Sequence, residues 1–177
     1  MSANSALAIS VGVLGGIATW LFLGPLGGVL AIWAAFVAWG CFFHCGGSES
    51  GLQSAILGNI AGAIVAGATL WVATQTGIAD KLGLPIWAGI CVGLGVAVMV
   101  LLANIEIFAA IPAQVYGFAS VAGLTLLSNG AGNLTSASMA NPVVVITLSM
   151  IVGAIFGWVS EKVAGMLASA GGAKAKA

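Results

Sequence analysis

Three side chains that could bind a metal stand close together in the sequence, at Cys41, His44 and Cys45. Spacings of three and four residues place all three on one face of a helix. Two thiols and an imidazole are ligands that suit Cu(I) or Zn. Three ligands leave a tetrahedral structural site incomplete, however, and cysteine also serves as a small buried hydrophobic residue. The segment therefore indicates either a soft-metal site or ordinary helix packing.

Glu106, Gln114 and Tyr116 are polar residues within a long apolar stretch, and we predict that they line a pore. An ionisable group at membrane depth is costly and usually functional, although a carboxylate at a turn near the headgroups would simply be hydrated. Pro112 frees a backbone carbonyl one turn earlier, and Gln114 supplies both a donor and an acceptor. This pair indicates either a broken helix beside a polar path or a hydrogen bond between helices. Asn59 is interpreted as a residue that hydrogen-bonds to a neighbouring helix.

The composition shows which solvent surrounds these residues. Of 177 residues, 61% are hydrophobic and 5% are charged, and none is arginine. Soluble domains carry about 25% charged residues, so the sequence predicts an integral membrane protein with the lipid bilayer as its main partner. Four lysines cannot neutralise a run of phosphates, which excludes a nucleic-acid partner. The sequence has few titratable groups and no phosphate-binding or hydrolase motif, so we expect neither an enzyme nor a cofactor.

The apolar runs predict an all-α polytopic membrane protein with six transmembrane helices. A crossing needs about 20 apolar residues, and every backbone polar group in hydrocarbon needs an internal partner, which a helix provides. The chain is treated as a single transmembrane domain over residues 1–177, and residues 167–177 are expected to form a mobile tail. The predicted spans are residues 7–23, 29–43, 52–74, 85–103, 107–127 and 143–166.

Six spans place both termini on one side of the membrane. Lys162, Lys174 and Lys176 lie at or beyond the last span, whereas Lys81 stands alone in an odd-numbered loop. Positive residues favour the cytoplasmic side. We therefore expect both termini in the cytoplasm.

The glycine pattern raises the question of an internal repeat. Dividing the chain near Asp80 gives three spans per half, which would orient the halves oppositely as a 3+3 inverted repeat. Glycine pairs four residues apart also favour close helix packing and a homo-oligomer. Chance pairing among 27 glycines is the alternative explanation. The pairs in corresponding spans are Gly12/Gly16 with Gly89/Gly93, and Gly58/Gly62 with Gly153/Gly157.

Three stretches resemble a known family. They are Phe-His-Cys-Gly-Gly at 43–47 followed by Gly-Leu at 51–52, residues 111–119 with Ile-Pro and Gly-Phe-Ala, and Gly-Ala-Ile-Phe-Gly at 153–157. In these the chain resembles domain-of-unknown-function family ten-ninety-seven, small multi-span bacterial inner-membrane proteins. The resemblance implies a bacterial inner-membrane location and no assigned activity. It therefore supplies no catalytic residues.

These observations support one leading hypothesis and two others. The leading hypothesis is a passive channel or facilitator for a small uncharged or weakly polar solute, acting as a homo-oligomer. Selectivity would then come from pore width and a few dipoles. The alternative is a non-transporting structural or accessory subunit of a membrane complex. A soft-metal-binding membrane protein is the third hypothesis.

Overall fold

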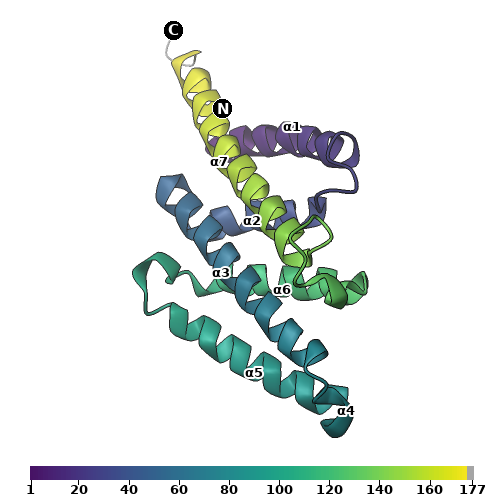
Figure 1. Ribbon diagram of the computed structural model, residues 1–177. Helices are drawn as coiled ribbons and strands as arrows, with labels where there is room; N and C mark the ends of the chain where they lie inside the picture. Colours follow the sequence, from purple (N-terminus) through teal and green to yellow (C-terminus); the bar gives the residue numbers. More distant parts are fainter. Residues whose placement is uncertain (175–177) are drawn as a thin grey trace.

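The computed structural model describes residues 1–174, and over that range the chain is built from helices and turns without strands (Figure 1). The predicted tail begins inside the last helix, and residues 175–177 lie outside the described part of the chain. The helices are α1 Ala3–Leu23, α2 Ile32–His44, α3 Ser48–Gln75, α4 Ala79–Leu82, α5 Leu84–Leu102, α6 Ile111–Leu127 and α7 Pro142–Lys174, with short 3-10 turns η1 Glu106–Phe108 and η2 Gly130–Asn133.

Four of these helices, α1, α3, α5 and α7, are long and apolar enough to cross a membrane. The chain is therefore a multi-pass membrane protein. The shorter apolar helices are α2 with 13 residues and α6 with 17, which correspond to lengths of about 20 and 26 Å. The hydrocarbon core is about 30 Å thick, so neither crosses it alone as a helix. Of the six helical crossings predicted, four are therefore supported by helices of sufficient length. The helices α2 and α6 are too short to cross unless the residues next to them complete the crossing.

Local sequence explains where the helices begin. Ser2 caps α1 by accepting a hydrogen bond from the Ser5 amide. Three of the four prolines lie in the first turn of a helix, Pro85 in α5, Pro112 in α6 and Pro142 in α7. The first turn tolerates proline because the amide that proline lacks would have no helical partner there.

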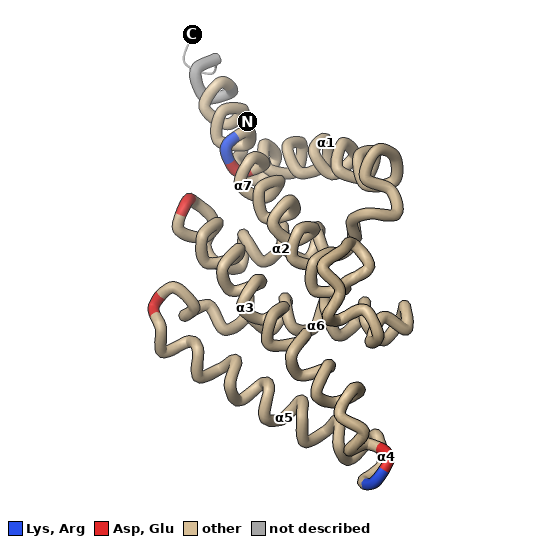
Figure 2. Tube along the Cα trace, viewed as in Figure 1, with Lys and Arg blue, Asp and Glu red and all other residues tan. Residues whose placement is uncertain are grey.

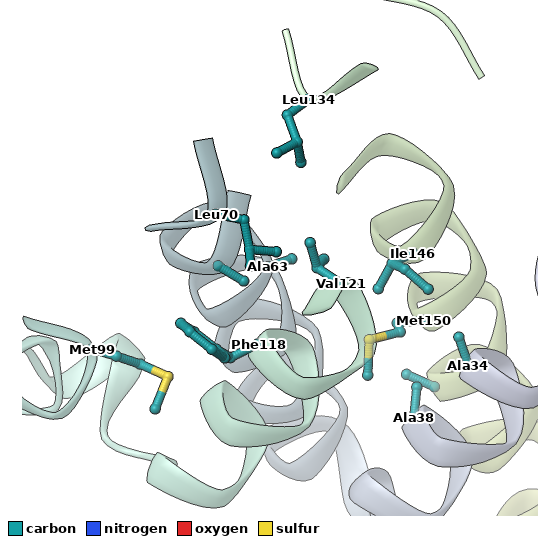
Figure 3. Close-up of a cluster of buried hydrophobic side chains, with 12 residues drawn as sticks. Ala34, Ala38, Ala63, Leu70, Met99, Phe118, Val121, Leu134, Ile146 and Met150 are labelled. Carbon is teal, nitrogen blue, oxygen red and sulfur yellow. The ribbon is translucent and has the colours of Figure 1, made fainter. Parts of the chain in front are cut away.

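The helices pack in an order that differs from their order in the chain. The central helices α3 and α7 contact each other, while α6 packs on α3 and α2 packs on α7. The outer helices are α1, which contacts α7, and α5, which contacts α3, so they lie at opposite edges of the molecule (Figure 1). The core between them is formed by small and medium apolar side chains from five helices and the η2 loop (Figure 3), including Ala34, Ala38, Ala63, Leu70, Met99, Phe118, Val121, Leu134, Ile146 and Met150.

Glycine permits the two closest helix crossings. A Cβ atom at Gly62 in α3 would overlap the Gln114 carbonyl of α6, and one at Gly153 in α7 would overlap the Ala35 carbonyl of α2. Both crossings therefore bring backbone against backbone, which maximises van der Waals contact between helices in lipid. The pairs in α1 and α5, by contrast, face open space within the protomer: Gly12, Gly16, Gly89 and Gly93.

Substituting Gly153 by alanine should therefore destabilise the bundle, since the added methyl forces α7 away from Ala35. We expect Gly153→Ala to lower the free energy of unfolding by about 1–3 kcal/mol. Gly123→Ala is the matched control, because its Cβ would enter open space and removing a helix glycine is neutral or favourable by about 0.5–1 kcal/mol. Unfolding in mixed micelles followed by tryptophan fluorescence measures both. Equal stability of the two variants would contradict the close crossing.

Candidate functional site

The chain leaves helical geometry between α5 and α6. Ile105 and Ala110 have extended or irregular backbone angles, and α6 starts only at Ile111. The Gln114 side chain is fully buried, and its Nε2 donates a hydrogen bond of 2.6 Å to the Phe108 carbonyl. Gln114 thus supplies a partner for a backbone group that the break leaves outside a helix.

This break lies inside the bundle. A Cβ at Gly58 would approach the Ala110 carbonyl oxygen to 3.4 Å, so α6 begins opposite Gly58 of α3. Gly58 lies ten residues after Ser48, which is about 15 Å along the helix from its start. The start of α6 is therefore about half a membrane thickness from the end of α3 that begins at Ser48.

A second break precedes α2. Residues 24–31 form turns, Ala31 is extended, and α2 begins at Ile32. The Ala31 amide donates a hydrogen bond of 2.9 Å to Ser149 Oγ on α7. Ser149 lies about 10 Å along α7 from Pro142. Both short helices thus start within the bundle, each with a polar side chain bonded to the preceding irregular backbone.

Four buried polar atoms have no hydrogen-bond partner in the described part of the chain. They are both amide atoms of Asn59, Gln114 Oε1 and Thr125 Oγ1, on side chains whose residues are at most 2% exposed. The Asn59 amide lies beside the Cys41 thiol. The sequence predicts an interhelical hydrogen bond for Asn59, and the neighbouring Cys41 thiol of α2 is the side chain placed to take part in one; Thr125 had no predicted role. Leaving a buried polar group unpaired costs about 1–3 kcal/mol.

The predicted metal ligands do not converge. The Cys41 and Cys45 sulfur atoms are 4.0 Å apart, but His44 is exposed and its Nδ1 instead hydrogen-bonds to Tyr116 Oη at 2.9 Å. Within residues 1–174, no group of three His, Cys, Asp or Glu side chains is arranged to hold a metal. Tyr116, predicted as a pore residue, therefore joins α6 to the end of α2, and metal binding stays a prediction.

The charged residues that the structure describes lie at the ends of the bundle (Figure 2). Glu106 is exposed on η1, beyond the end of α5, whereas Gln114 is buried at the start of α6. Asp80 and Lys81 lie together on α4. Glu106 and Gln114 therefore lie in different environments, one exposed and one buried. A pore-lining role for Glu106 stays a prediction.

An exposed ion pair joins the start of α3 to α7. Lys162 Nζ lies 2.6 Å from Glu49 Oε1, and Glu161 accepts a hydrogen bond from the Ser48 amide. Glu49 stands in the first turn of a 28-residue helix, outside the roughly 20 residues that cross hydrocarbon. The hydrogen bond from Lys162 lowers the pKa of the Glu49 carboxyl, because it favours the charged form. This contact ties the two central helices together at one end.

A cavity of about 350 Å³ lies at the other end of the bundle. It reaches Ala31, where α2 begins, and its lining includes the polar side chains of Ser128 and Asn133. The Thr125 backbone lies next to Gly130, a residue of this lining. Spacing along the sequence does not indicate the cavity, because its wall forms only where Ala31 meets the loop that carries Ser128 and Asn133. The cavity is therefore a mainly apolar recess with two polar side chains, beside the break that precedes α2.

A family model described as "Protein of unknown function (DUF1097)" matches residues 8–165. No curated protein and no solved structure matches the chain. The family match covers most of the sequence and confirms the resemblance found in residues 43–52, 111–119 and 153–157. The chain belongs to the DUF1097 family.

Proposed function

We propose that this member of the DUF1097 family is a passive channel or facilitator for a small uncharged or weakly polar solute, built as a 3+3 inverted repeat. The observation that carries the proposal is the pair of broken crossings, in which α2 and α6 each begin inside the bundle after irregular backbone. Non-helical backbone at membrane depth is tolerated where it is buried in protein or lines a polar cavity. Discontinuous helices of this kind commonly form the sites of transporters with inverted repeats.

Burial supports the repeat. Adding 79 to the number of each buried residue of α2 gives a buried residue of α6. Subtracting 91 from each buried residue of α7, over the range where its side chains are described, gives a buried residue of α3. The α2 residues are Ala34, Ala35, Ala38, Trp39, Cys41 and Phe42, and their counterparts are Ala113, Gln114, Gly117, Phe118, Ser120 and Val121.

The close contacts follow the same two offsets. Gly62 against the Gln114 carbonyl corresponds to Gly153 against the Ala35 carbonyl. The approach of Gly58 to the Ala110 carbonyl likewise corresponds to the hydrogen bond between Ser149 and Ala31. Matching burial alone can arise from any two amphipathic helices, whereas matching contacts between pairs of helices supports a common three-helix plan.

Three crossings per half would orient the two halves oppositely. Both termini would then lie on one face, and Lys162, Lys174 and Lys176 favour the cytoplasm for that face by the positive-inside tendency. The family resemblance supports the bacterial inner membrane as the location. The cavity beside Ala31 is lined by residues of the connections between α1 and α2 and between α6 and α7, which lie on the opposite face in this arrangement.

The lack of charge inside the bundle supports a neutral solute. The charged side chains of residues 1–170 lie at the ends, so nothing within would compensate a desolvated ion. Selectivity then depends on the width of the pore and on the dipoles that line it. Gln114 and Tyr116 are the pore-lining candidates nearest the break before α6, and Glu106 is the candidate at the entrance of the pore. We assign no catalysis to this arrangement.

Purified protein in liposomes should raise the permeability to at least one small neutral solute. We expect water, urea, acetamide or glycerol to equilibrate severalfold faster than in protein-free liposomes, with no added leak of potassium or chloride. Stopped-flow light scattering measures the rates, and a characterised channel in parallel liposomes serves as the positive control. If all four solutes equilibrate no faster in the proteoliposomes than in protein-free liposomes, the proposal of a facilitator is contradicted.

A homo-oligomer is part of the proposal, because the open glycine pairs of α1 and α5 can admit a neighbouring helix. Gently extracted protein should have a mass that is a multiple of the 17.4 kDa chain. Replacing Gly89 and Gly93 by leucine should reduce that mass to one chain, because the added side chains prevent close approach. The control Gly40→Leu changes an exposed glycine that has no glycine partner four residues away.

Light scattering of the detergent complex measures these masses. The accessory-subunit alternative predicts a different result, recovery only in complex with another protein. That outcome, or a wild-type protein of one-chain mass, would contradict the homo-oligomer.

A further inference from the structure

We infer that Asn59 and Gln114 form a solute-binding site at the α3–α6 crossing, for a neutral molecule that carries both hydrogen-bond donors and acceptors. The inference rests on the proposed facilitator and identifies where its solute binds. The residues carrying the two side chains are 1% and 0% exposed, yet three of their polar atoms have no partner in the described part of the chain.

The backbones of the two residues lie where α3 and α6 approach most closely. A Cβ at Gly117 would overlap the backbone of Asn59, and one at Gly62 would overlap the Gln114 carbonyl. Asn59 lies within three residues, about 4 Å, of the midpoint of the 28-residue α3, and therefore near the middle of the hydrocarbon core that this helix crosses. The unpaired amides therefore stand at mid-depth, next to the break that precedes α6.

The other half of the molecule shows that the crossing does not require these amides. By the offsets that relate the halves, Asn59 corresponds to Met150 and Gln114 corresponds to Ala35. The α2–α7 crossing is thus formed by apolar residues at the same positions and is equally close at Gly153. Packing alone accounts for Met150 and Ala35, whereas three buried amide atoms without partners reduce stability unless a ligand or water pairs with them.

The unpaired atoms determine the chemistry of the ligand. Asn59 offers an amide donor and a carbonyl acceptor, while Gln114 offers only its Oε1 acceptor because Nε2 is bonded to Phe108. A ligand must therefore donate at least one hydrogen bond to an oxygen and accept one from an amide. Water, urea, small amides and short alcohols meet this requirement. A cation would use only the two oxygens and would leave the Asn59 amide donor unpaired, so it fits this set less well than a neutral molecule.

The test compares Asn59→Leu with wild type, using urea and acetamide as probes in proteoliposomes. Leucine has a similar volume and no polar atoms, so the flux of both probes should fall at least tenfold. The thermal unfolding midpoint in detergent should stay the same or rise, because an unpaired buried amide has been removed. Gln53→Leu is the control, an exposed amide on the same helix, and both readouts should match wild type. Asn59→Ser, which restores a donor and an acceptor, should recover flux above that of Asn59→Leu.

The outcomes separate this inference from the proposed function. If wild-type liposomes admit water or glycerol but neither urea nor acetamide, the two amide probes are not ligands of the site. If they admit none of the four solutes, the proposed function itself is overturned. Wild-type flux in Asn59→Leu would overturn the site while leaving the facilitator intact. A lowered midpoint in Asn59→Leu, or serine no better than leucine, would show that the amide is structural and would overturn the site. Should Asn59→Leu fail to fold, Asn59→Ala takes its place, because alanine also removes both polar atoms and the same fall in flux is expected.

Discussion

Every backbone N–H and C=O group in hydrocarbon must find a partner within the protein, and the arrangement of this chain depends on how that requirement is met. Four long helices meet it by themselves. The connections before α2 and α6 do not, and each relies on a side chain, Ser149 for the Ala31 amide and Gln114 for the Phe108 carbonyl. Close crossings at glycine then bury both breaks against α7 and α3. Irregular backbone inside the bundle is stable because these contacts surround it.

The two halves share this plan but differ in chemistry. The same crossing carries Met150 and Ala35 in one half and Asn59 and Gln114 in the other. An apolar pair is sufficient for packing, so the polar pair is the part of the crossing on which the proposed function depends. The apolar core joins residues of both halves in one cluster, with Phe118 of α6 and Met150 of α7 among its members (Figure 3).

The sequence predicted the helical segments well because unbroken apolar runs and first-turn prolines mark them directly. It also indicated a break near Pro112, since proline and a nearby glutamine are local signals. Pro25 and the glycines around it mark the turn after α1, but no residue next to Ile32 marks the start of α2 inside the bundle, so that start could not be foreseen. The contact between His44 and Tyr116 joins residues 72 positions apart, and the unpaired state of Asn59 depends on the α3–α6 crossing. Both depend on tertiary packing, which spacing along the chain does not reveal.

The central claim is that α2 and α6 complete crossings in opposite directions, and single-cysteine accessibility tests it most directly. In a chain whose native cysteines are replaced by alanine, Pro25→Cys and Asn104→Cys each place one exposed thiol in the turn that follows a long helix, α1 or α5. A membrane-impermeant maleimide should label Asn104→Cys only from the face that carries the N-terminus and Pro25→Cys only from the opposite face. Labelling of both from the same face, as four crossings without α2 and α6 would give, would contradict the inverted repeat.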